Sequence, residues 1–491
     1  MSLARGFFWT SLAVVVTKAL SVGNQWILGF ILEPADFGVF AIAIGSTVLI
    51  SGFLDSGVAK LLVKEQHQLD YYFRRCVIIS AGLGLASSFI LIASTALQQE
   101  QEVRQVIWVL AAFIPFIAIS HCFKSVLLIR LDFKRISHAE MLNAFIYGVI
   151  LIGAALLGLK AFSFVIALGS SYLFFFLFYR YSAGKMVNQA MNSSQLASYG
   201  SVLSQLKWII LATFGMGMAL RGDYLVIGRL VDTHAIGQYY FGFMTITNIG
   251  LMVAQGVNNV LMPNFTKLQQ DPIRLRSQFE FLSFGLVAVT SILCLGFIYL
   301  GPDLIHFVWY EKWHEAIVIS VLIALSFPLR MLSPMGSALL ESMGLWRTRA
   351  LLTWLDAITL VMAAAAGAYS FGILGAAVGV ALQRGTFGLM LYLQAARQMQ
   401  CPAFVGKLIL YAAPFVLAVV VYYGVMSWWF QFTTMTALTG YNGLSLWQKL
   451  PLIALSFLVF VGLIWSLHKS YVTQLLQRLR QMPLVRNLLP T

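Results

Sequence analysis

Four basic side chains lie near the middle of long apolar stretches of this chain. They are Lys18, Arg221, Arg330 and Arg384. A charge at mid-bilayer depth is costly unless it faces water or protein, so each of them is a candidate site residue. An arginine can bind two phosphate oxygens at once, and a lysine acts as a point charge. The pattern predicts a cationic cleft that would bind an anionic head group.

Uncharged polar side chains form stripes on two of these apolar stretches. Ser21 and Gln25 follow Lys18 at intervals of three and four, which places them on one helix face, and Asn24 widens that face. The second stripe consists of Thr245, Asn248, Gln255 and Asn259. We interpret these amides as hydrogen-bond partners for ligand hydroxyls. The alternative is that they join helices, at about 0.6 kcal/mol for each bond.

Three acidic side chains also lie deep in apolar stretches. They are Asp55, Asp223 and Asp356. Arg221 and Asp223 are two positions apart and cannot pair on a regular helix. Buried carboxylates near cations have tunable pKa values, so we expect Asp55 and Asp223 to respond to a coupling proton or sodium ion. Pairwise neutralisation of the deep cations by these acids is the alternative.

The composition predicts the membrane as the surroundings of these residues. Hydrophobic residues make up 60% and charged residues 10% of the chain, whereas a soluble domain has about 25% charged residues. We expect an all-α integral membrane protein of about fourteen transmembrane helices. The expected spans are 7–32, 37–63, 72–97, 103–130, 139–159, 161–181, 203–230, 234–263, 280–301, 313–340, 348–370, 372–396, 404–430 and 446–468.

The net charge of +14 follows this topology. Lys and Arg concentrate in every second connecting segment, as the positive-inside rule requires if both termini are cytoplasmic. The basicity is therefore a topology signal, and nucleic acid is not an expected partner. The chain would be a multi-pass membrane protein with both termini in the cytoplasm.

A repeat divides the chain into two similar parts. Residues 29–62 recur at 228–261, and three glycines of the first copy, Gly29, Gly38 and Gly57, each match a glycine 199 positions later. The match extends backwards to Trp9, which matches Trp208. We expect two pseudo-symmetric six-helix lobes around a central cavity, plus two extra C-terminal helices. The expected parts are the N-terminal lobe 1–181, a cytoplasmic linker 182–204, the C-terminal lobe 205–396, two further spans 397–468 and an amphipathic tail 469–491. A solvated tail is the alternative for the last part.

Cysteines and histidines indicate no metal site. The four cysteines are far apart, and no two histidines have metal-ligand spacing on one helix. We expect no cofactor, no metal and no enzymatic activity. The long outer segment near 431–446 has no charged residue, so it offers no acid–base site.

Several short motifs resemble one family of membrane transporters. The opening Gly6-Phe-Phe-Trp-Thr, continuing to Leu32-Glu-Pro-Ala-Asp-Phe-Gly-Val-Phe, is similar to the start of the polysaccharide transporter (oligosaccharide flippase) family. This family belongs to the multidrug, oligosaccharidyl-lipid and polysaccharide exporter superfamily. Met262-Pro-Asn-Phe-Thr-Lys-Leu-Gln-Gln-Asp, Arg274-Leu-Arg and Glu311-Lys-Trp also resemble it. The resemblance covers spans 1–12, and spans 13 and 14 match only in hydropathy.

The resemblance implies a flippase for undecaprenyl-diphosphate-linked oligosaccharide repeat units used in surface polysaccharide synthesis. It implies alternating access driven by an ion gradient, with membrane lipids and a polysaccharide polymerase or other glycan-assembly proteins as partners. The alternatives are a multidrug antiporter of the same superfamily, a membrane glycan polymerase or ligase, and a scaffold of a glycan-assembly complex. The cationic excess argues against the antiporter, and the uncharged outer segment argues against the enzyme.

Overall fold

The computed structural model describes residues 3–50, 57–191, 196–399, 404–430 and 446–480. Inside these ranges some helical side chains remain undescribed, including those of residues 251–260. Asp55 and residues 481–491 of the predicted tail therefore lie outside the described residues, as do the side chains of Gln255 and Asn259.

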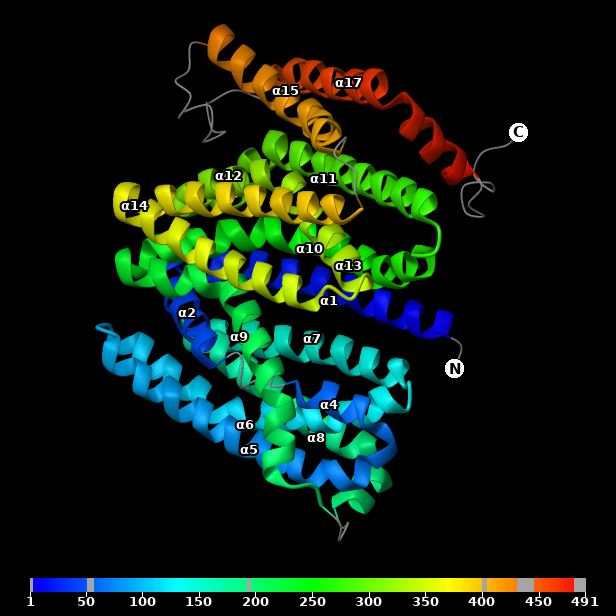
Figure 1. Cartoon of the computed structure of the whole chain (residues 1–491). Helices are drawn as coiled ribbons and strands as arrows, with labels where there is room; N and C mark the ends of the chain where they lie inside the picture. Colours follow the sequence, from blue (N-terminus) through cyan, green and yellow to red (C-terminus); the bar gives the residue numbers. More distant parts are fainter. Residues whose placement is uncertain (1–2, 51–56, 192–195, 400–403, 431–445, 481–491) are drawn as a thin grey trace. The chain divides into compact units, whose positions relative to one another are not determined.

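All regular structure in the described ranges is helical, which confirms the predicted all-α class (Figure 1). The first half of the chain contains α1 (Leu3–Ile31), α2 (Pro34–Ser46), η1 (Thr47–Ile50), α4 (Val58–Lys64), η2 (Gln66–Gln68), α5 (Leu69–Ser94), η3 (Thr95–Leu97), α6 (Gln101–Ile129), α7 (Phe133–Leu156), α8 (Phe162–Met191) and α9 (Tyr199–Leu230). The second half contains α10 (Thr233–Leu268), α11 (Pro272–Trp309), η4 (Tyr310–Trp313), α12 (His314–Arg330), α13 (Leu332–Ser342), α14 (Trp346–Gln398), α15 (Phe404–Phe430) and α17 (Leu446–Arg480).

Among the described residues, ten helical segments are long and apolar enough to cross a membrane. Two of them are long enough for more than one crossing, since about 20 residues make one crossing. Residues 272–342 contain α11, η4, α12 and α13, and α14 leaves helical geometry at Phe371 and Gly372. The multi-pass membrane protein is thus confirmed, while the number of fourteen crossings stays a prediction.

The chain forms two compact units. The first unit comprises residues 1–252 and 350–380, and the second comprises residues 253–349 and 381–491. The borders between the units fall inside α10 and α14. The predicted lobe boundaries, with a linker at 182–204, are not tested by this division and stay a prediction.

Within the first unit, the two copies of the repeat pack directly against each other through glycine. A Cβ atom on Gly38 of α2 would lie 1.7 Å from the carbonyl oxygen of Thr233. A Cβ atom on Gly237 of α10 would lie 1.7 Å from the carbonyl oxygen of Pro34. Thr233 follows Pro34 by 199 positions, as Gly237 follows Gly38, so the contact is reciprocal, as in a two-fold interface. The two copies of the repeat therefore pack against each other as a pair.

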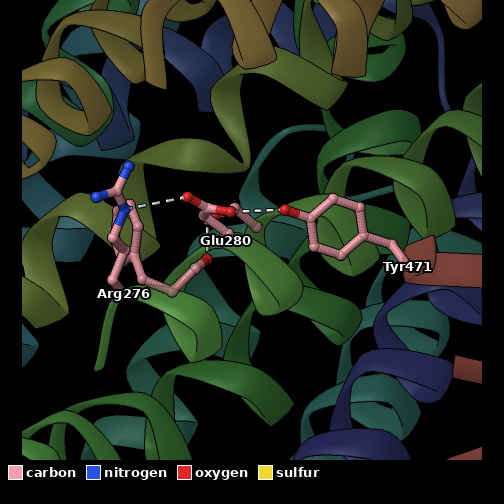
Figure 2. Close-up of polar contacts among 5 residues, drawn as sticks. Arg276, Glu280 and Tyr471 are labelled. Atoms are coloured by element: carbon pink, nitrogen blue, oxygen red, sulfur yellow. Dashed lines mark hydrogen bonds and ion pairs between the residues drawn. The ribbon is translucent and has the colours of Figure 1, made fainter. Parts of the chain in front are cut away.

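In the second unit, polar contacts attach α17 to α11 at well-separated points. Figure 2 shows Glu280, whose Oε2 accepts a 2.6 Å hydrogen bond from the Tyr471 hydroxyl and whose Oε1 lies 3.5 Å from Arg276 Nε. Near the other end of α11, Lys449 Nζ lies 2.6 Å from Asp303 Oδ1. Lys449 is almost fully buried, and removing one partner of a buried ion pair is strongly destabilising.

Candidate functional site

A cavity of about 360 Å³ lies among α1, α2, α7, α8 and α10, entirely within the first unit. We call it the first-unit pocket. Its polar lining residues are Thr17, Ser21, Asn24, Gln25, Glu140, Asn143 and Asn248. Its aromatic lining residues are Phe37, Tyr147, Phe164, Phe175 and Tyr240. Amide and hydroxyl groups between aromatic rings make this a hydrogen-bonding site, in which Glu140 is the one residue with an ionisable carboxyl group.

Gln25 joins α1 to α10 at the wall of the pocket. Its Nε2 donates to the carbonyl oxygen of Phe241 at 2.9 Å and to Thr245 Oγ1 at 3.0 Å. Its Oε1 accepts a hydrogen bond from Asn248 Nδ2 at 3.3 Å. Gln25 and Asn248 are both buried. The first stripe and the second stripe of the sequence therefore meet, and these two amides act as a bridge between helices as well as pocket wall.

Asn24 reaches the pocket because α7 has a glycine opposite it. A Cβ atom on Gly148 would lie 2.7 Å from Asn24 Oδ1 and 2.8 Å from Asn24 Nδ2. Any larger side chain at Gly148 would push the amide away. Asn24, Gln25 and Asn248 are thus three predicted binding residues that the structure brings together.

Helix α7 supplies polar residues that the sequence analysis missed. Asn143 Oδ1 is buried and accepts no hydrogen bond. Glu140 lines the pocket and pairs with Lys124 Nζ at 3.1 Å. Glu140, Asn143 and Tyr147 are spaced three and four residues apart, which places them on one helix face. That spacing indicates a polar face on α7. The prediction started from cations in the middle of a span, and the middle of α7 contains none.

The predicted cations divide between the two units. Lys18 is half-buried on α1, one turn before Ser21, and does not line the pocket. Arg221 of α9 is exposed, and its Nη1 lies 3.5 Å from Thr47 Oγ1. Neither of these two predicted cations is a lining residue of the first-unit pocket.

Arg330 and Arg384 belong to the second unit. A Cβ atom on Gly388 of α14 would lie 2.8 Å from the Cα atom of Arg330, so α14 and α12 pack closely there. The guanidinium of Arg330 lies 5.4 Å from the ring centre of Phe327, and Arg384 is buried. Each unit therefore holds two of the four predicted cations, and the single cationic cleft stays a prediction.

Asp223, a predicted ion-coupling residue, is fully buried in α9. Its Oδ2 accepts a 2.8 Å hydrogen bond from the Tyr239 hydroxyl of α10. A buried carboxylate needs such donors to remain ionised. Asp223 lies in the second copy of the repeat at the place of Asn24, away from the pocket lining.

The chain is similar in sequence to several polysaccharide biosynthesis proteins. The chain is 22% identical over 345 residues to the teichuronic acid biosynthesis protein TuaB of Bacillus subtilis, covering 68% of this chain and 70% of that protein. It is 22% identical over 355 residues to the lipopolysaccharide biosynthesis protein WzxC of Escherichia coli, covering 68% and 69%. Similarity to the amylovoran biosynthesis protein AmsL of Erwinia amylovora is 29% over 116 residues, and covers 24% of this chain and only 29% of that protein.

Solved structures show the same fold. The lipid II flippase MurJ in an inward closed conformation superposes with a TM-score of 0.68 at 14% identity, covering 94% of this chain and 99% of that one. An inward-facing multidrug transporter of the MATE family superposes with a TM-score of 0.57 at 14% identity, covering 82% and 95%. At this identity the likeness concerns the fold alone.

The family model described as "Polysaccharide biosynthesis protein" matches residues 27–318. This range includes α2, α7, α8 and α10, four of the five helices that line the first-unit pocket. The resemblance found in the sequence motifs is confirmed, and the chain belongs to the polysaccharide biosynthesis protein family.

Proposed function

We propose that the chain is a flippase that moves a polyprenyl-diphosphate-linked oligosaccharide across the bacterial cytoplasmic membrane for surface polysaccharide synthesis. The observation that carries this proposal is the family match, which includes four of the five apolar helices that line a polar pocket. An oligosaccharide cannot cross hydrocarbon without losing its hydrogen bonds to water. Amides in a membrane-embedded pocket replace those bonds, while the polyprenyl tail remains in the bilayer.

The topology of this proposal follows from charge and from the repeat. The chain crosses the membrane fourteen times with both termini in the cytoplasm, as the distribution of Lys and Arg favours. Two six-helix lobes, 1–181 and 205–396, exchange access between the two sides. The reciprocal contact of Gly38 and Gly237 supports a pseudo-two-fold relation between the repeat copies. Such repeats are common in transporters that alternate between inward and outward access.

The charged residues have separate roles in this proposal. Lys18, Arg221, Arg330 and Arg384 attract the diphosphate, because cations and guanidinium forks match phosphate oxygens. Asp223, and Asp55 beyond the described residues, respond to a proton or sodium gradient. The burial of Asp223 and its hydrogen bond from the Tyr239 hydroxyl support this role, because burial and hydrogen bonding tune the pKa of a carboxylate.

Complementation of a strain that lacks this gene tests the proposal. We expect the deletion to remove surface polysaccharide and to leave lipid-linked repeat units on the cytoplasmic face. The wild-type gene should restore both, and Lys18→Ala, Arg330→Ala and Arg384→Ala should each reduce export at equal protein level. Gly153→Ala is a matched control, because a Cβ atom there meets no atom within 4 Å. Unchanged surface polysaccharide in the deletion strain would refute the flippase proposal.

A further inference from the structure

We infer that the first-unit pocket binds one uncharged sugar ring of the substrate, separately from the diphosphate. This inference rests on the proposed function and assigns the pocket a ligand class. It is carried by the size of the pocket, by the charge of its lining and by an unsatisfied acceptor in its wall.

The size of the pocket suits a small polar group. Its volume of about 360 Å³ lies at the lower end of ligand pockets, which range over about 300–1,000 Å³. A single sugar ring fills such a space, whereas a longer oligosaccharide exceeds it. The remaining sugars of a repeat unit therefore lie outside this pocket.

The lining is chemically wrong for a diphosphate. Among its described residues there is no Lys or Arg, and its one carboxylate, Glu140, would repel a phosphate. Glu140 is paired with Lys124 at 3.1 Å, so it is also a poor counter-ion for a cationic drug. The two predicted cations of the first unit, Lys18 and Arg221, are not among the lining residues. An uncharged ligand is the class that these groups accept.

Asn143 provides the independent sign of a missing partner. Its Oδ1 is buried and accepts no hydrogen bond. A buried acceptor without a partner costs about 1–3 kcal/mol, so it is unusual in a purely structural position. A sugar hydroxyl in the pocket would donate to it. Gln25 and Asn248 already bond to each other and therefore serve less well as diagnostic residues.

The aromatic walls complete the match. A pyranose ring carries C–H groups on its faces and hydroxyl groups at its rim. Tyr147 of α7 and Tyr240 of α10 offer flat apolar surfaces, and the amides of Asn24 and Asn143 offer both donors and acceptors. Pockets with apolar walls and a few placed polar groups are typical of small-molecule sites.

The test is saturation-transfer NMR on the purified full-length protein in nanodiscs, with glucose, galactose and N-acetylglucosamine as probes. We expect transfer to at least one of these sugars, and at least tenfold weaker binding in Asn143→Leu, with an unchanged or higher thermal unfolding midpoint. Thr359→Val is the control, because the Thr359 hydroxyl bonds within its own helix at 2.7 Å, as the pocket residue Thr17 does at 3.1 Å. Pyrophosphate should not displace the sugar.

Three results would overturn the inference: no transfer to any of the three sugars, full sugar binding in Asn143→Leu, or displacement of the sugar by pyrophosphate. The proposed function fails differently. If the protein binds sugar in the pocket but does not restore surface polysaccharide, the sugar-binding inference is supported and the flippase proposal is refuted. If the protein restores surface polysaccharide while Asn143→Leu binds sugar normally, the flippase proposal is supported and the sugar-binding inference is refuted.

Discussion

Positions 24 and 25 of the first repeat copy carry amides, whereas the matching positions of the second copy carry Asp223 and Tyr224. Gln25 borders the first-unit pocket. Tyr224 is 1% exposed and lies against Gly45, whose Cβ atom would be 2.9 Å from the Tyr224 Cβ atom. On one side of the pseudo-two-fold contact, the Tyr224 ring is therefore packed in the interior. On the other side, Gln25 borders an open pocket.

This difference teaches how a repeat can become a binding site. The reciprocal glycines keep the backbones of the two copies in the same arrangement, so side chains alone decide which side is hollow. Asn24 packs against Gly148 and lines the pocket, whereas Asp223 is buried and accepts a hydrogen bond from the Tyr239 hydroxyl. The two copies therefore share their glycine contacts but differ in the side chains at these positions.

The largest expected effect comes from breaking the shared contact. Gly38→Ala and Gly237→Ala each place a methyl group 1.7 Å from a backbone oxygen, so α2 and α10 must move apart. We expect each to destabilise the protein by about 3 kcal/mol, the upper end for overpacking. Thermal unfolding in detergent measures this, with Gly153→Ala as the control. An effect at only one of the two glycines would contradict the reciprocity.

A smaller effect is expected from the second copy's buried carboxylate. Tyr239→Phe removes the hydroxyl that donates to Asp223 Oδ2. Hydrogen bonds to charged groups contribute about 1.5–3 kcal/mol, so the unfolding free energy should fall by that amount. Tyr310→Phe, at an exposed ring, is the matched control. Equal midpoints for both variants would show that Asp223 does not depend on this donor.

The first copy's amide bridge should contribute less. Gln25→Leu removes the bonds to Phe241 and Thr245 and the acceptor for Asn248. Neutral hydrogen bonds contribute about 0.5–1.5 kcal/mol each, and packing of the leucine offsets part of the loss. We expect a decrease of about 1–2 kcal/mol in unfolding free energy, against no change in Thr359→Val. A more stable Gln25→Leu protein would show that the bridge exists for the ligand alone.

The smallest effect concerns the start of α10, where Thr233 replaces the Pro34 of the first copy. Glu100, before α6, bonds to Thr233. Burial raises the pKa of Glu100 above its ordinary value of 4.5, and the nearby Glu102 and Asp232 carboxylates add to this, while the Thr233 bond opposes it. Because the pKa of Glu100 is higher in the folded than in the unfolded protein, its protonation stabilises the fold below about pH 4.5. This contribution is lost as the pH rises through the folded-state pKa.

Glu100→Gln removes this titration and keeps a hydrogen-bonding group. We therefore expect the variant and the wild type to have similar unfolding midpoints at about pH 4, and the variant to be slightly more stable at about pH 7. Midpoints measured across this range check the sign. A wild type that gains stability relative to the variant as pH rises would contradict it.

The sequence predicted part of the site because periodicity reports which face of a helix is polar. It placed Gln25 and Asn24 on one face of α1 and Asn248 on α10, and these residues meet in the structure. It did not predict Asn143. The prediction rested on deep charges and on the repeat, and α7 contains neither at its centre.

The sequence by itself determined the membrane class, the all-helical fold, the family and the register of the repeat, because hydropathy and glycine spacing are local properties of the chain. Only the tertiary structure decided that α7 closes a pocket with α1 and α10, and that Lys18 and Arg221 belong to a different unit from Arg330 and Arg384. The physical reason is that a helical pattern specifies a face, whereas the neighbour of that face depends on packing between residues more than one hundred positions apart.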